Sequence, residues 1–353
     1  MSLLSRAQPG AGTKPDTPLR RRAQRSTGVL TGLVVVAALC VVSLAVGSRP
    51  VPVDTTLDAL LNFNPGNDLH LLVIQLRLPR TILAVLVGAA LGLAGALMQA
   101  LTRNPLAEPG ILGINSGAAA AVAVGIASFG VSAVAGYVWF GFLGAGIASV
   151  IVYVLGRAHD AGTNPVRLVL AGAGLSVVLG ALTSIVLINS DPDTYDDFRQ
   201  WATGSLQGRG FDVLPVVALV CLVGFVLAFS MSRSLDSLAL GGDLSRALGI
   251  SPRRTMIISA LAVLLLSGAA TAAAGPIAFV GLAAPHMARL LVGPGHQWLL
   301  PYSMVTSAIV LLAADILGRL VLFPGEIGAG IMTALIGGPV FLALVRRRKM
   351  ARL

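Results

Sequence analysis

The chain has 353 residues, of which 56% are hydrophobic and 11% are charged, and its mean hydropathy is +0.86. Soluble domains carry about 25% charged residues, so this composition excludes an ordinary soluble enzyme and predicts an all-α polytopic membrane protein. The 41 glycines favour close helix packing in lipid. Cys40 and Cys221 both lie in apolar runs, which indicates buried packing and neither a disulfide framework nor a metal site.

Ten apolar segments are expected, and a polar, basic segment precedes the first of them. Residues 1–27 are rich in Pro and Gly, and we expect a disordered tail there. The first apolar run, 28–47, is too long for a cleaved signal peptide, so we expect it to be retained. Nine further spans are predicted at 81–101, 113–129, 135–155, 167–188, 213–229, 256–274, 275–291, 303–322 and 329–345. The permease domain is thus 28–345, and a basic tail, 346–353, follows it.

The basic residues are distributed asymmetrically between the two sets of loops. With ten spans and an internal N-terminus, most Lys and Arg residues fall on the cytoplasmic side, as the positive-inside rule requires. Both termini are then cytoplasmic, and the net charge of +10 is explained without nucleic acid. The topology predicts a multi-pass protein of the bacterial cytoplasmic membrane.

Three basic residues break that rule. Arg77, Arg80 and Arg319 fall at the external ends of the second and ninth spans. One interpretation is that their long side chains only reach toward the membrane surface. The other is that they form a basic rim that docks an acidic partner, in which charge pairs set the register and the encounter rate.

The longest internal loop contains LGGDLSRALGISPRRT, residues 240–255. The pattern predicts a short helix with Asp243 near its positive N-terminal end and Gly249 at its C-cap. Such a helix could insert into a groove on a soluble partner. The alternative is an ordinary solvated loop.

A second unusual segment is GPIAFVGLAAPHMAR, residues 275–289. Its two prolines and two glycines predict a broken helix, which is tolerated only where it is buried in protein or lines a cavity. His286 could relay protons, although a structural hydrogen bond is the commoner role for such a histidine. Small-residue stripes at Gly88, Gly92 and Gly95, and similarly at Gly172, Gly174 and Gly180, predict close helix packing.

Several functional groups are absent from the sequence. The only lysines, Lys14 and Lys349, lie in the tails, so the chain lacks a P-loop for ATP phosphates. Asp315 is the one carboxylate clearly inside a span, and Arg319 four residues later suits an i,i+4 pair. An ion-coupled secondary transporter usually needs acidic groups near the midplane, which makes that class the weaker alternative. No catalytic residue, metal site or cofactor motif is indicated, so we expect a transport subunit and not an enzyme.

Taken together, these motifs resemble the FecCD family of ABC importer permeases, the type II importers of ferric siderophores, haem and cobalamin. The resemblance covers nearly everything after residue 28. The motifs that carry it are RLPRT (77–81), GALMQALTRNPLAEPGILGINSGA (95–118), WATGSL (201–206), LGGDLSRALGIS (240–251), GPIAFVGLAAPHMAR (275–289) and TALIGGPVF (333–341).

The resemblance implies the ten-helix ABC type II importer transmembrane fold, in a homodimer or paralogous heterodimer around a central pathway. Cytoplasmic ATP-binding subunits and an external substrate-binding protein would be its partners. The family's docking arginines correspond to Arg77, Arg80 and Arg319. Its cytoplasmic gate corresponds to Asn104, Leu106, Pro165 and Val166, and its fifth helix lines the pathway. Its ATPase-coupling helix, residues 242–249, corresponds to Gly242, Asp243, Ser245, Arg246, Ala247, Leu248 and Gly249.

Two departures from the family pattern are visible. The chain has Glu326-Ile327-Gly328 where the family often has Glu-hydrophobic-Pro, and Ser245 where Ala is frequent. The resemblance implies an ATP-driven importer of an iron chelate, with a ferric siderophore favoured and cobalamin or haem as alternatives. ATP hydrolysis would belong to a separate subunit.

Overall fold

The computed structural model describes residues 18–47, 49–131, 134–157, 165–322 and 325–346. These residues form helices joined by turns, with no strand among them. The longer helices are α1 (Pro18–Ala45), α4 (Leu78–Thr102), α5 (Ile114–Phe129), α6 (Val134–Arg157), α7 (Pro165–Ile188), α9 (Leu214–Ser230), α12 (Pro252–Ala274), α13 (Val280–Val292), α14 (His296–Val321) and α15 (Ala329–Arg346). The shorter ones are α2 (Val53–Leu61), α3 (Asp68–Leu71), η1 (Leu72–Arg77), η2 (Pro109–Leu112), α8 (Pro192–Ala202), α10 (Ser232–Ala239) and α11 (Gly242–Ala247).

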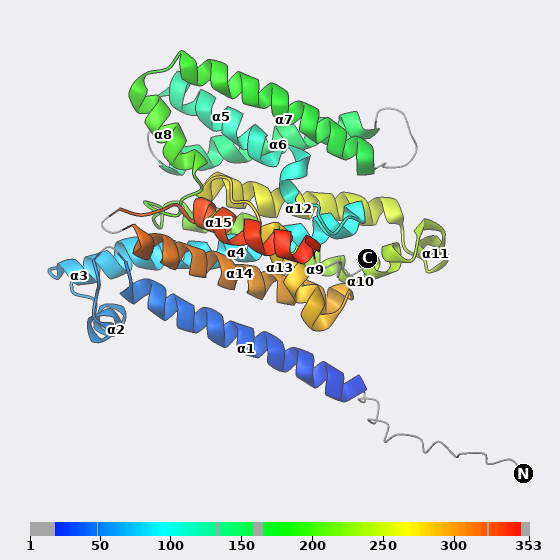
Figure 1. Ribbon diagram of the computed structural model, residues 1–353, viewed down its shortest axis with the longest axis horizontal. Helices are drawn as coiled ribbons and strands as arrows, with labels where there is room; N and C mark the ends of the chain where they lie inside the picture. Colours follow the sequence, from blue (N-terminus) through cyan, green and yellow to red (C-terminus); the bar gives the residue numbers. More distant parts are fainter. Residues whose placement is uncertain (1–17, 48, 132–133, 158–164, 323–324, 347–353) are drawn as a thin grey trace, which may run out of the picture.

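The long helices lie side by side along one axis, so the bundle has two ends (Figure 1). We call them the α8 end, which also holds α2 and α3, and the α11 end, which also holds α10. The start of α1 and the last turn of α15 both lie toward the α11 end. The described helices therefore begin and finish at the same end of the bundle.

The apolar helices match the predicted spans in place. Six helices of the described residues are long and apolar enough to cross a membrane, and α9 with α10 forms a seventh, bent by 47°. Three shorter apolar helices, α5, α13 and α15, occupy the remaining predicted positions. The chain is therefore an all-helical polytopic protein, and the exact number of ten spans remains a prediction that depends on these three shorter helices.

Helix α4 is the centre of the bundle. In the helix that contains it, 83% of the most apolar stretch is buried, against 11% in α1 and in α7. It packs on α14, α12 and α13 (Figure 1). The predicted glycine stripe makes this possible: a Cβ at Gly92 would lie 2.5 Å from the Ser303 carbonyl, and one at Gly95 only 1.8 Å from the Gly281 carbonyl. The packing prediction for α4 is confirmed, because only hydrogen fits at these positions.

Two of the three glycines in the corresponding stripe on α7 have no such neighbours within one copy of the chain, whereas Gly172 is buried. A Cβ at Gly174 or Gly180 would meet nothing within 4 Å. The apolar side chains around them, among them Val177 and Ile188, are strongly exposed. Helix α7 thus presents an apolar, small-residue face to the outside of the chain.

The structure differs from the sequence expectation in three places. Helix α1 begins at Pro18, so residues 18–27 are helical and not part of a disordered tail, whereas residues 1–17 and 347–353 lie outside the described part. Helix α8 occupies a loop for which no helix was predicted, and α10 another. Both are short amphipathic helices with low average hydropathy, which a search for membrane-length apolar runs does not detect.

We expect Gly95→Ala to destabilise the bundle, by about 1–3 kcal/mol, because its methyl group would overlap the Gly281 carbonyl. The matched control is Gly174→Ala, which enters open space. Thermal unfolding of the two variants in the same detergent measures the difference. Equal unfolding midpoints for both variants would contradict the close packing of α4 on α13.

Candidate functional sites at the two ends of the bundle

Asp315 joins two arginines inside the α8 end. Its Oδ1 accepts hydrogen bonds from Arg80 Nη2 and Nε at 2.8 and 3.1 Å, and its Oδ2 accepts from Arg319 Nε at 3.0 Å and from Arg319 Nη2. All three side chains are buried, with Asp315 only 1% exposed. The i,i+4 pairing predicted for Asp315 and Arg319 is confirmed, and Arg80 from α4 joins it. A buried charge removed from water is tolerated when it is paired and hydrogen-bonded in this way.

Arg77 and Arg319 also hold the end of α1. Arg77 Nη1 donates to the carbonyls of Leu44 and Ala45 at 2.7 and 2.8 Å, and Arg319 Nη1 donates to the Ser43 carbonyl at 2.8 Å. The last carbonyls of a helix lack partners within the helix and carry its negative dipole end. Two guanidinium groups therefore cap α1 from neighbouring helices.

Arg80 reaches one further carboxylate, that of Glu326 before α15, at 2.7 Å. The Glu326 side chain is 14% exposed, more than any other carboxylate or guanidinium of this group. We call Arg77, Arg80, Asp315, Arg319 and Glu326 the arginine cluster. The structure brings the three predicted docking arginines together, and all three are buried and bonded within the chain. Their role in docking stays a prediction.

Two polar cavities flank the Arg80–Glu326 pair at the α8 end. One, of about 410 Å³, lies between that pair and α8 and the turn after it; the other, of about 350 Å³, reaches Arg77 and Arg209. Arg209 is buried in the loop before α9, and burial lowers the pKa of its guanidinium to about 10. It therefore stays protonated at neutral pH. Glu326 is thus accessible from a polar hollow on each side.

Two of the sequence motifs meet the start of α15 near this end. The Gly330 N–H donates to the Gly204 carbonyl at 2.7 Å, which joins the start of α15 to the WATGSL turn. Gly275, with φ +74°, ends α12 against the Trp201 carbonyl, and a Cβ there would lie 2.1 Å from that oxygen. Glycine is required at this point both by the backbone angle and by the close approach.

The broken helix is present as predicted. Residues 275–279 are not helical, and α13 starts at Val280 after Phe279, whose φ of +68° is unusual for a bulky residue. Gly281 lies against Leu91, at the middle of α4. The turn after α4 folds back to the same level, since Pro109 lies beside Gly281 and the Glu108 carboxylate lies near the Phe279 backbone. Two irregular segments thus pack against each other inside the bundle.

The predicted gate residues occupy two segments at the α11 end. Asn104 is exposed, and its side-chain oxygen accepts a hydrogen bond from the Leu106 N–H at 3.0 Å, which shapes the turn after α4. Leu106 is 39% exposed. Pro165 and Val166 begin α7, and their side chains lie outside the described part of the structure.

The predicted coupling helix forms as α11, Gly242–Ala247. Gly241 and Gly249, with φ +110° and +76°, end the turns on either side of it. The Ser245 hydroxyl is buried, 2.8 Å from the Ser237 carbonyl of α10 and 2.7 Å from the Gly241 carbonyl. Serine instead of alanine here therefore ties α11 to α10. Leu244 and Leu248 are 49% and 57% exposed, so α11 presents an apolar surface next to the exposed Asp243–Arg246 pair.

Contacts that sequence reasoning missed fasten α10 to the long helices. Arg103 Nη2 donates to the Leu238 carbonyl at 2.9 Å, and the Asp236 carboxylate accepts from both the N–H and the Nδ1 of His296 at 2.8 and 2.7 Å. Since α10 was not predicted, no sequence signal connected these residues. They link α10 to α4 and to the first residue of α14.

A buried arginine was also missed. Arg289, 3% exposed, donates from Nη2 to Gln99 Oε1 at 3.0 Å, and Gln99 Nε2 donates to the Leu282 carbonyl at 3.3 Å. The Nε and Nη1 atoms of Arg289 have no hydrogen-bond partner among the described residues. The sequence motif 275–289 contains Arg289, but nothing in the motif predicts its pairing with Gln99.

A bundle of apolar helices of membrane length is the architecture of a polytopic membrane protein. Comparison with known proteins identifies the family: residues 34–347 match the model of the FecCD transport family. The chain belongs to this family.

The relatives and the solved structures agree with this assignment. The chain is similar to FepD, the ferric enterobactin transport system permease protein of Escherichia coli (strain K12), at 46% identity over 93% of this chain and 96% of the relative. It is 38% identical to FhuB, the iron(3+)-hydroxamate import system permease protein of Bacillus subtilis (strain 168), over 90% of this chain and 84% of that one. It is 36% identical to HmuU, the hemin transport system permease protein of Yersinia pestis, over 89% and 95%.

Among solved structures, the fold is similar to an inward-facing conformation of a metal-chelate type ABC transporter. The TM-score is 0.79 and the sequence identity is 28%, and the match covers 91% of this chain and 99% of the other. The chain is therefore a multi-pass membrane permease, a transport subunit, as the sequence motifs had indicated.

We expect Asp315→Asn to cost about 3–5 kcal/mol of stability, because it leaves Arg80 and Arg319 buried without their shared negative charge. The matched control is Asp196→Asn, which removes one partner of an exposed pair with Arg199 and should change stability by less than about 1 kcal/mol. Unfolding of both variants in detergent provides the comparison. Similar small losses would show that the arginine cluster does not depend on the Asp315 charge.

Proposed function

We propose that this chain is the permease subunit of an ATP-driven importer that carries an iron chelate, a ferric siderophore in preference to cobalamin or haem. The observation that carries the proposal is the FecCD membership together with relatives whose names specify ferric enterobactin and iron(3+)-hydroxamate. Because the sequence has no P-loop, ATP would be hydrolysed by separate subunits. The hemin relative supports haem as the second candidate cargo.

The α11 end would face the cytoplasm and the α8 end the outside. This orientation is supported by the positions of the basic residues, since Arg233, Arg246, Arg253 and Arg254 all lie in or beside α10, α11 and the start of α12. Both termini would then be cytoplasmic. The chain would be a multi-pass protein of the bacterial cytoplasmic membrane.

A binding protein would dock on the α8 end around the arginine cluster. Since Arg77 and Arg319 are occupied with the end of α1, their contribution would be to fix the shape of this end. Arg80 differs, because one of its nitrogens is bonded to the partly exposed Glu326 between two polar cavities. An acidic residue of the binding protein would take the place of Glu326 on Arg80.

Cargo would pass between this chain and a second permease subunit, a copy of itself or a paralogue. The exposed apolar face of α7 supports its role as a lining helix, since it has few neighbours within one chain. The gate would be formed by the turn with Asn104 and Leu106 and by the start of α7 at Pro165 and Val166. Movement of that turn would be passed to the broken helix through the contact between Pro109 and Gly281.

ATPase subunits would bind α11. Its exposed Leu244, Ala247 and Leu248 suit insertion into a groove of a soluble partner. The buried Ser245 and the His296–Asp236 contact would pass its movement to α10 and α14.

The proposal as a whole is tested by reconstitution. Proteoliposomes that contain this permease, its ATPase and its binding protein should accumulate a radiolabelled ferric siderophore only with ATP, and should take up haem and cobalamin less well. Uptake that follows an ion gradient without the ATPase would instead support a secondary transporter. ATP-dependent uptake of haem or cobalamin alone would keep the transporter class and overturn the cargo.

We expect Glu326→Gln to tighten binding of the substrate-binding protein by about fivefold, because a neutral amide competes less well for Arg80. Docking is measured with the labelled binding protein on permease in nanodiscs at several salt concentrations. The control is Asp196→Asn, which removes a carboxylate from the same cavity without touching Arg80. Unchanged or weaker docking of the Glu326 variant would contradict the exchange at Arg80.

We expect Ala247→Trp to reduce the ATPase recovered with the permease at least tenfold, because the bulky side chain would block insertion of α11. Ala127→Trp, at an exposed position near the opposite end of the bundle, is the control for an added tryptophan. Co-purification from detergent-solubilised membranes gives the ratio. Normal recovery with both variants would remove α11 from the ATPase interface.

A further inference from the structure

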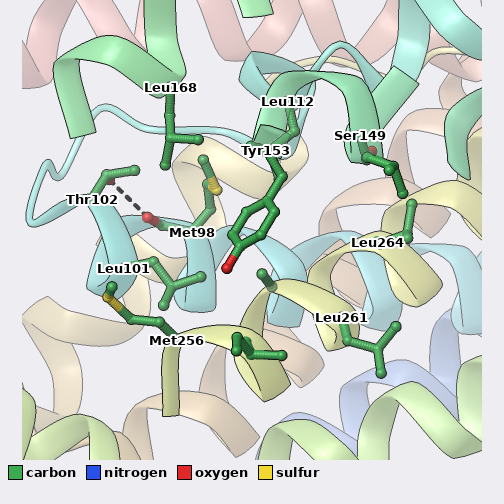
Figure 2. A pocket seen from close by; sticks show the side chains of 13 residues that line it. Met98, Leu101, Thr102, Leu112, Ser149, Tyr153, Leu168, Met256, Leu261 and Leu264 are labelled. Atoms are coloured by element: carbon green, nitrogen blue, oxygen red, sulfur yellow. Dashed lines mark hydrogen bonds between the residues drawn. The ribbon is translucent and has the colours of Figure 1, made fainter. Parts of the chain in front are cut away.

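An apolar cavity of about 270 Å³ opens between α4, α6 and α12 (Figure 2). Its residues come from the end of α4 and the start of α12, so it lies in the half of the bundle toward the α11 end. Its floor is buried and comes from α4 and η2, including Met98 and Leu112. Its rim is exposed and apolar: Val150 of α6 is 58% exposed, and Ile257 and Leu261 of α12 are 42% and 44% exposed. The cavity thus leads from an apolar outer surface, between α6 and α12, to the centre of the bundle.

The lining offers little to a polar ligand. The Thr102 hydroxyl donates to the Met98 carbonyl at 2.7 Å, and the Ser149 hydroxyl donates to the Ala145 carbonyl at 2.8 Å, so both are satisfied within their own helices. Figure 2 shows Tyr153 pointing into the space between Leu101 and Leu261. Polar groups that enter such a space without partners lose their hydration, so a hydrophilic metal chelate is a poor occupant.

The apolar lining also limits what can fill the cavity. A hydrocarbon chain is narrow and flexible, and it is the solvent that surrounds an apolar rim at this depth.

Positive charge lies at the membrane-surface side of the same rim. Arg253 precedes Met256 and Ile257 by three and four residues on α12, and Arg254 precedes Ile257 and Leu261 by three and seven, so both share the face that lines the cavity. Both are exposed, and neither is paired with a carboxylate of the described residues. Basic residues at a membrane surface attract anionic lipid headgroups.

We propose that this cavity is a binding site for one acyl chain of an anionic phospholipid, whose headgroup lies against Arg253 and Arg254. The site lies beside the proposed gate, since Leu112 of η2 and Leu168 of α7 also line it, but it does not depend on the docking and coupling proposals above. The phospholipid comes from the surrounding bilayer, and its acyl chain fills the gap that protein side chains leave open between α4, α6 and α12.

The test uses phosphatidylglycerol with a photoreactive group near the end of one acyl chain, in nanodiscs that contain the complete chain. After irradiation, adducts should concentrate on the peptides with residues 149–153 and 256–264. Ala260→Phe fills the cavity and should lower these adducts roughly tenfold, since displacing two methylene groups is enough for such a loss. Leu222→Phe on the exposed face of α9 should leave them unchanged.

Further variants keep the result decisive. If Ala260→Phe does not fold, Leu264→Phe takes its place in the same cavity. Replacing both arginines by Gln should lower the preference for phosphatidylglycerol over a phosphatidylethanolamine probe roughly tenfold. Adducts spread evenly over exposed helices, or insensitive to the filling variant, would overturn the proposal. Disulfide-linked dimers through Val150→Cys, absent from the parent chain, would also overturn it, by showing that a second copy covers the mouth.

Discussion

The α8 end depends on one carboxylate, that of Asp315, held between two arginines from different helices. Burial of these ions is costly, and pairing alone seldom repays the cost. Here each guanidinium also donates hydrogen bonds to a second group: Arg80 to the Glu326 carboxylate, and Arg319 to the Ser43 carbonyl at the end of α1. Helices α1, α4 and α14 and the segment before α15 are therefore fastened at one point. The charges at the α8 end therefore hold four elements together.

Helices α4 and α14, which the arginine cluster joins at the α8 end, are also joined to each other through α10 at the α11 end. Arg103, just after α4, donates to α10, and His296, at the start of α14, is held by Asp236 of α10. Between these points the glycines of α4 bring its backbone against α14 and α13, which leaves little freedom for sliding. Because α4 and α14 run the full length of the bundle, a displacement of α10 at one end has a direct mechanical route to the arginine cluster at the other.

Much of this was predictable from the sequence, for identifiable reasons. Long apolar runs and helical glycine spacing located α4, α12 and α14, and i,i+4 spacing anticipated the Asp315–Arg319 pair. The missing parts are contacts between segments distant in the chain, such as Arg80 with Asp315 and Glu326, or Arg289 with Gln99. Counting charges predicts on which side of the membrane an arginine lies. It cannot predict whether the side chain faces outward or, like Arg80, is paired with a carboxylate 235 residues away in the sequence.

The broken segments have a consequence for how such a bundle can move. Backbone outside a helix is tolerated at this depth only if its polar groups find partners. Here the turn after α4 lies against the break before α13, with Glu108 near the Phe279 backbone and Pro109 beside Gly281. A rearrangement of that turn must therefore break these contacts or carry the start of α13 with it. Gly281, pressed between Leu91 and Pro109, leaves the start of α13 almost no room to stay behind. The turn and α13 should consequently move as one unit.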